Sequence, residues 1–258
     1  MVQDLYSIMN TLQDLERTFE LGYGHKYGMK IEKFSQFDLQ ANTLSLASSF
    51  NNLNPFLDTP TELYLTSSDI ADAGKKVTVL YISQDRSMQE VEYTLNGQTA
   101  VSIGIDKYCI WRMFNSNGSN YVGSIYAGSE AVPVGGIPSI ANTYCEIPIT
   151  FGDITPVNQS LTGIFSVPAG YTGILTLGHI GASKGVDLRA AAFIRELGGV
   201  FRYSKTLAAF ETVSTLPLFT RIPEKTDIKP VAFSQSGGVA HLDYNILLIK
   251  NEYIDRFN

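Results

Sequence analysis

The chain has 258 residues, of which 44% are hydrophobic and 17% charged, so it can bury a substantial core as two domains of ordinary size. Its net charge of −6 excludes the basic face with which nucleic-acid-binding proteins displace counterions. No segment approaches the roughly 18 uninterrupted apolar residues that span a bilayer, and acidic residues near the N-terminus argue against a signal peptide. We therefore expect no nucleic acid and no membrane among the partners of this protein.

The first predicted element is a helix over residues 2–21. Its apolar residues follow a three-four spacing that gives a narrow seam, as in a coiled coil or a helix laid on a partner. The seam consists of Leu5, Ile8, Leu12, Leu15 and Phe19. Two interpretations stay open. The helix docks on its own subunit, or it serves self-association or anchoring on a larger particle.

Residues 31–60 have an irregular pattern, which predicts a long connecting arm with one or two short strands on the surface. From residue 61 to residue 104, apolar side chains recur at every second position in three segments, which is typical of half-buried strands. Polar breaks separate these segments, and Asn96-Gly97 predicts a tight hairpin turn. The basic doublet Lys75-Lys76 falls in one of the breaks, where we expect a solvated turn.

Further strands are predicted over residues 107–114 and 121–128, followed by a loop and linker over residues 129–156 that contains a strand at residues 144–149. From residue 158 onward, about eight short strands with regular turns indicate a sandwich or jelly roll. One turn is expected at Pro168-Ala169-Gly170. The Ala-rich segment that begins at Asp187 also has helical propensity, so a helix is the alternative there.

The predicted fold class is therefore all-β, with two β-sandwich (jelly-roll-like) domains preceded by a short N-terminal α-helix. The expected boundaries are residues 1–30 for the helix and arm, 31–150 for the first β-domain and 151–258 for the second. Cys109 and Cys145 lack redox or zinc-binding spacing and are expected to be buried free thiols, although a disulfide stays open. Together with the absence of a signal peptide, this predicts folding in a reducing cytoplasm.

Catalytic and metal-binding signatures are absent from the sequence, which has no nucleophile elbow, His-Glu-x-x-His motif, P-loop or EF-hand. His241 and Asp243 share a predicted strand face and could reach one metal ion, but such a pair is usually structural. Glycoside hydrolysis needs two nearby carboxylates, for which Asp187, Glu196, Glu211 and Asp227 are candidates. Asp227 is more simply explained by a turn contact. We expect no enzymatic activity, no metal and no cofactor.

Several segments, taken in order, carry a resemblance to a known class of proteins. They are Lys33-Phe34, LYLTSSDIADAGKKVTVLYI, EVEYTLNGQTAV, Gly123–Gly128, Val167–Gly173 and Ile222–Ile228. This order resembles the virion structural proteins of tailed bacteriophages, in particular capsid decoration proteins of the auxiliary (cement) or head-fibre type. The resemblance covers most of the chain beyond residue 30, and its motifs belong to the scaffold. It implies β-sandwich domains, symmetric assembly that is often trimeric, and attachment to a capsid shell.

The resulting hypothesis is a non-enzymatic virion protein that decorates or stabilises the capsid exterior as a symmetric homo-oligomer, a trimer. Its expected partners are the major capsid protein, further copies of itself and other virion proteins. Its expected location is the capsid surface, after assembly in the bacterial cytoplasm. The alternative is a receptor- or glycan-binding module of a tail fibre or spike, in which Trp111 and surface tyrosines stack on host sugars. A small polysaccharide hydrolase is the third hypothesis.

Overall fold

The computed structural model describes residues 26–150, 155–183, 185–210 and 214–254, and the side chains of residues 205–219 are not described. Within these residues the regular secondary structure is almost entirely antiparallel strand, which confirms the all-β class. The predicted helix over residues 2–21 lies outside the described residues. None of the described helices is long and apolar enough to cross a membrane.

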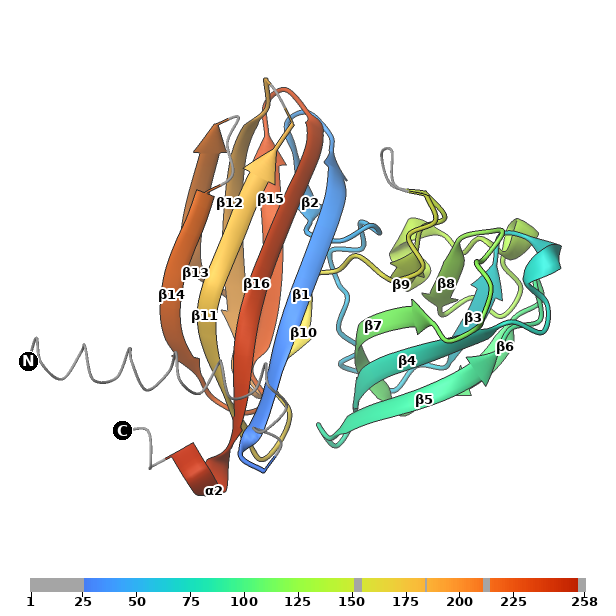
Figure 1. The fold of residues 1–258 in the computed structure, drawn as a ribbon, viewed down its shortest axis with the longest axis horizontal. Helices are drawn as coiled ribbons and strands as arrows, with labels where there is room; N and C mark the ends of the chain where they lie inside the picture. The colour runs from blue at the N-terminus through green and yellow to red at the C-terminus, as the bar shows by residue number, and fades with distance from the viewer. Residues whose placement is uncertain (1–25, 151–154, 184, 211–213, 255–258) are drawn as a thin grey trace, which may run out of the picture.

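Two sheets face each other in what we call the large lobe (Figure 1). The first sheet has the order β1 (Gly28–Leu39), β16 (Gly238–Lys250), β11 (Tyr171–Ala182) and β14 (Ser214–Ile222). The second has the order β10 (Phe165–Ser166), β15 (Asp227–Ser234), β12 (Asp187–Arg195) and β13 (Arg202–Phe210), and β2 (Thr43–Leu46) also pairs with β15. A short helix, α2 (Asn251–Ile254), follows β16.

Two smaller sheets form the small lobe, which is inserted between β2 and β10 (Figure 1). One has the order β6 (Val101–Gly104), β3 (Leu63–Ser67), β8 (Ile125–Gly128) and β9 (Thr143–Ile147). The other has the order β5 (Met88–Thr94), β4 (Lys76–Ser83) and β7 (Lys107–Asn115). Three single-turn helices lie in its loops: η1 (Ile70–Asp72), η2 (Val134–Gly136) and η3 (Ile140–Asn142).

The prediction of a surface arm over residues 31–60 is wrong for its first part, residues 31–39, which belong to strand β1. Strand β1 is 12 residues long and pairs along its whole length with β16, from Gly28 opposite Ile249 to Leu39 opposite Gly238. The strand is hard to recognise because two polar side chains, Lys33 and Ser35, point into the core. Their inward placement hides the alternation that would mark a half-buried strand. Residues assigned by sequence to an arm are therefore part of the large lobe.

Most other predicted strands are confirmed, but several pairings differ from a simple meander. Strand β3 pairs with β6 and β8 rather than with β4, although β4 and β5 form the expected antiparallel pair. The turn at Pro168-Ala169-Gly170 joins β10 and β11, which belong to opposite sheets. The Ala-rich segment forms β12 and not a helix, because it is paired on both sides, with β13 and β15. Its small side chains lie against the facing sheet, around a cavity of about 60 Å³.

Most buried apolar side chains of the two lobes form one continuous cluster. At its centre Trp111 of β7 stacks on Phe165 of β10, with ring centroids 4.4 Å apart. The Lys33 ammonium donates a hydrogen bond to the Trp111 carbonyl oxygen at 2.5 Å, which joins β1 to β7. The two lobes therefore share a core, and their division into separately folding domains stays a prediction.

Candidate interaction surface

Exposed aliphatic side chains lie on the loops of the small lobe, and we call this group the aliphatic tip. Its members are Ile70, Val122, Val132, Val134, Ile137 and Ile140. Val132 and Val134 are each 90% exposed. Helix η1, which carries Ile70, lies at the end of the small lobe that points away from the large lobe (Figure 1). Soluble proteins seldom leave aliphatic side chains grouped in this way unless the surface contacts a partner.

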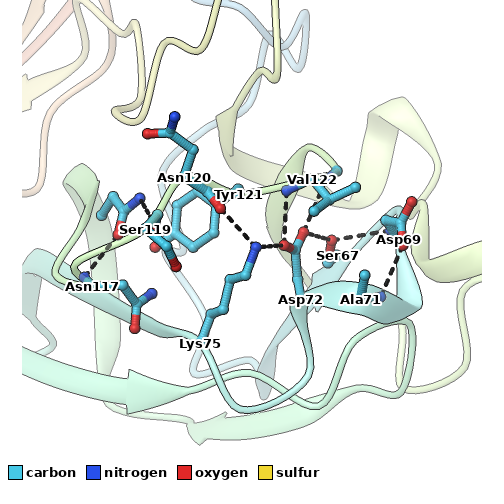
Figure 2. Close-up of polar contacts among 12 residues, drawn as sticks. Ser67, Asp69, Ala71, Asp72, Lys75, Asn117, Ser119, Asn120, Tyr121 and Val122 are labelled. Carbon is cyan, nitrogen blue, oxygen red and sulfur yellow. Dashed lines mark hydrogen bonds and ion pairs between the residues drawn. The ribbon is translucent and has the colours of Figure 1, made fainter.

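A buried carboxylate, Asp72, holds the tip loops in place. Its oxygens accept hydrogen bonds from the Ser67 hydroxyl at 2.6 Å and from the backbone amides of Val122 and Gly123 at 2.8 and 2.9 Å. Figure 2 shows Lys75 reaching the same carboxylate, at 2.8 Å. Burial acts to raise the pKa of Asp72, but these hydrogen bonds outweigh it, so the pKa lies below its ordinary value. The carboxylate is thus ionised and fully partnered, which is a structural role.

The sequence predicted a solvated turn at Lys75, but its side chain is mostly buried. Its ammonium bonds both Asp72 and the carbonyl oxygen of Asn120, at 2.6 Å (Figure 2). Lys76 begins strand β4 and pairs with Glu92 at 2.6 Å. Both lysines thus connect segments that are far apart in the sequence.

Residues 129–142 form a closed loop, here the end loop, that carries four of the six tip side chains. The amide of Ser129 donates to the carbonyl of Asn142 at 2.9 Å, which closes its ends. The Glu130 carboxylate accepts from the Ser139 hydroxyl at 2.6 Å and from the Asn142 amide group at 2.7 Å. These hydrogen bonds lower the pKa of Glu130. The loop thus has its own polar framework, and its aliphatic side chains are left to face outward.

Two glycines let the tip segments pack backbone to backbone. Gly136 has a φ of +75°, and a Cβ there would lie 1.9 Å from the carbonyl oxygen of Ser67. Gly97, in the predicted Asn96-Gly97 turn, has a φ of +59°, and a Cβ there would lie 2.8 Å from the carbonyl oxygen of Ile70. These contacts place the Gly136 part of the end loop against the β3 end, and the Gly97 turn against η1.

The small lobe is also fixed to the large lobe by a buried ionic joint around Asp227. Arg86, in the β4–β5 turn, bonds this carboxylate at 3.0 Å, and Arg195 of β12 bonds it at 2.9 Å. The Tyr108 hydroxyl donates to it at 2.5 Å. Burial, followed by the negative charge of Asp227, raises the pKa of Tyr108. Arg195 further holds Asp58 through two hydrogen bonds of 2.8 and 2.9 Å. The joint makes the tip a rigid extension of the sandwich.

The acidic residues that the sequence offered for hydrolysis have different surroundings in the structure. Asp187 accepts hydrogen bonds from Ser234 and from the amide of Gln235 in the β15–β16 turn. Asp227 has both oxygens engaged in the joint, which is more than the turn contact expected for it. Glu196 borders the same small hollow as Asp227, and Glu211 lies outside the described residues.

The other predicted site residues have varied outcomes. Trp111 is 2% exposed, so its predicted stacking on host sugars is wrong: the hydrophobic ring is used inside the core. The amide of Ser35 donates to Asp243, and no three metal-binding side chains are grouped in the described part of the chain. Cys109 and Cys145 are buried free thiols, as predicted. The apolar seam of Leu5, Ile8, Leu12, Leu15 and Phe19 lies outside the described residues.

The sequence did contain a signal for the tip that periodicity did not capture. In the end loop, AVPVGGIPSIA places valines and isoleucines between prolines and glycines, where no strand or helix pattern accounts for them. Apolar residues in such a segment either fill the core beneath a loop or face outward. Which of the two occurs depends on the hydrogen bonds of Glu130 and on the close approach of Gly136 to Ser67. Both contacts exist only in the folded loop.

The fold and this surface define a class: an all-β protein of antiparallel sheets that exposes an aliphatic surface on a rigid lobe. No protein-family profile matches the chain, and no curated protein sequence matches it. Among solved structures, the module TmCBM61 in complex with β-1,4-galactotriose is similar over 78% of this chain and 99% of its own, with 10% identity and a TM-score of 0.22.

Two structures from infectious bursal disease virus are similar at the same level. The VP2 subviral particle matches 87% of this chain and 72% of its own, with 10% identity and a TM-score of 0.23. The T13 viral particle matches 87% of this chain and 70% of its own, with 12% identity and a TM-score of 0.24. At these TM-scores, none of the likenesses carries an argument about this chain.

Proposed function

We propose that this protein is a non-enzymatic virion structural protein that decorates or stabilises a phage capsid from outside, as a symmetric homo-oligomer, a trimer. The observation that carries the proposal is the aliphatic tip. Its side chains are exposed in the single subunit, and assembly with another protein would remove them from water. Burying apolar surface contributes about 25 cal/mol per Å², so such a surface is a strong source of binding free energy.

The rigidity of the tip also supports a role in assembly. Association costs free energy when loops and side chains must be ordered, and a preorganised surface reduces that cost. The Asp72 hydrogen bonds, the closed end loop and the ionic joint fix the tip before any partner arrives. A protein that binds only the assembled shell stabilises it by its binding free energy, which is the mechanism we propose.

The test uses the full chain and capsid shells prepared without it. Wild-type protein is expected to cosediment with the shells, and the double variant Val134→Asp/Ile137→Asp is expected to lose at least tenfold in affinity. The matched control is Ile105→Asp, which changes an exposed isoleucine between β6 and β7, outside the tip. Circular dichroism confirms folding of each variant. Equal cosedimentation of the double variant and wild type would refute the role of the tip.

The N-terminal seam is a second proposed contact. Removing residues 1–21 should abolish either trimer formation or shell binding, since the seam is proposed to serve self-association or anchoring. Light scattering gives the mass of the oligomer, and cosedimentation gives shell binding. If the truncated chain keeps both properties, the seam has neither role.

A further inference from the structure

A second group of exposed apolar side chains lies on the large lobe, at the turn between β12 and β13. Leu197 and Val200 of the turn are 59% and 70% exposed, and Tyr203 of β13 is 61% exposed. Together with two charged residues beside them, Glu196 and Arg202, they border one concave surface, and we call these five residues the hairpin surface. The shell contact proposed above is made by the aliphatic tip of the small lobe, so it does not use the hairpin surface.

The hairpin surface has a fixed shape in the single subunit. The amide of Gly199 donates a hydrogen bond to the carbonyl oxygen of Glu196 at 2.9 Å, which closes the turn. The ring of Tyr203 meets the ring of Phe193 edge to face, with centroids 6.0 Å apart, and this contact orients it. Because these groups are already ordered, a partner that covers them pays little conformational entropy.

Two opposite charges flank the apolar part of the hairpin surface. Glu196 directly follows β12, and Arg202 is the first residue of β13. Both side chains are exposed, and among the described residues neither has an ion-pair partner. Protein interfaces combine an apolar centre with a polar rim, and they are enriched in tyrosine and arginine. The hairpin surface has this composition.

We infer that the hairpin surface is the contact between copies of this chain in the homo-oligomer. The inference rests on the proposed function and deepens it by naming the residues of self-association. A surface that meets its own copy must be complementary to itself, and one acid beside one base satisfies this condition. In every contact of a closed ring, Glu196 of one copy pairs with Arg202 of the next. Leu197 and Val200 then leave water between the two subunits.

Reversing these charges in the full-length protein tests the pairing. Light scattering and sedimentation velocity measure the mass of the oligomer and its dissociation with dilution. Glu196→Arg and Arg202→Glu each bring like charges together across the contact, so each is expected to weaken association at least tenfold. The double variant Glu196→Arg/Arg202→Glu restores opposite charges and is expected to return to within threefold of wild type. Glu90→Arg, on exposed β5 of the small lobe, is the matched control.

A second variant tests the apolar centre. Leu197→Asp/Val200→Asp is expected to give a folded protein, by circular dichroism, that associates at least tenfold more weakly than wild type. Single reversals that associate like wild type, or a double reversal that restores nothing, would overturn the inference.

The outcomes separate this inference from the proposed function. A wild-type protein with the mass of one chain would overturn both the inference and the proposed trimer. A wild-type oligomer that the hairpin variants leave intact would overturn the inference alone, even if those variants lose shell binding, because the hairpin surface would then meet the shell. The decoration role is tested independently by cosedimentation of the tip variants with capsid shells.

Discussion

Replacing the buried Lys33 with methionine should stabilise this protein. Lys33 is 5% exposed, and its hydrogen-bond partner in the described residues is the Trp111 carbonyl oxygen, which carries no charge. Burial lowers the pKa of Lys33 from 10.5 to about 8, and the nearby Cys109 and Cys145 thiols offset part of that effect. One pKa unit corresponds to about 1.4 kcal/mol, so holding this ammonium in the core costs roughly 3 kcal/mol at neutral pH.

The lowered pKa of Lys33 also determines how the free energy of unfolding changes with pH. In the unfolded chain Lys33 loses its proton near pH 10.5, and in the folded protein near pH 8. Between these values the unfolded state binds more protons, so the free energy of unfolding rises with pH. Below pH 8 the full penalty remains. Burial raises the pKa of tyrosines such as Tyr108, so above about pH 10 these residues make the free energy of unfolding fall with pH. The effect of Lys33 is therefore measured below pH 10.

Lys33→Met removes the penalty but leaves the Trp111 carbonyl oxygen without its donor, which costs about 1 kcal/mol. The expected net gain at pH 7 is therefore about 1–2 kcal/mol, or roughly 3–6 °C in Tm for a chain of this size. Urea unfolding at pH 7 to 9.5 measures both the gain and the slope. Lys76→Met removes only an exposed ion pair with Glu92, so it should change stability by less than about 1 kcal/mol and give no gain. A destabilised Lys33→Met protein, or one that keeps the wild-type slope, would refute the reasoning.

Two further substitutions test the frameworks that hold the small lobe. Asp72→Ala leaves two backbone amides without their acceptor and removes the carboxylate partner of the Lys75 ammonium. The free energy of unfolding should therefore fall by about 3–5 kcal/mol, and the Gly123 amide should exchange faster with solvent. Unaltered exchange at Gly123 would contradict this. Arg195→Lys cannot reproduce the paired hydrogen bonds to Asp58 and should cost about 1–3 kcal/mol in urea unfolding. A loss below 0.5 kcal/mol would show that the joint depends on other contacts.

The positions of most strands could be predicted from the sequence, but their pairing in the sheets could not. Alternation at Val77, Val79 and Tyr81 marks β4 because every second side chain enters one core. Nothing in that pattern states that Gly28 pairs with Ile249, more than two hundred residues away. The insertion of the small lobe between β2 and β10 follows from such long-range pairings, which the local pattern does not predict.

The site was less predictable than the fold for a related reason. The aliphatic tip exists because Gly136 meets Ser67 and because Asp72 collects amides from another loop. These contacts depend on which segments meet, and local periodicity carries no information on that.

The antiparallel pairing of β1 with β16 has a practical consequence for attaching cargo. Because Gly28 lies opposite Ile249, the chain enters and leaves the sandwich at the same end (Figure 1). A fluorescent label or an antigen joined directly before β1 or directly after α2 would therefore emerge from one end of the sandwich. The small lobe is inserted between β2 and β10, so neither fusion would be attached to it.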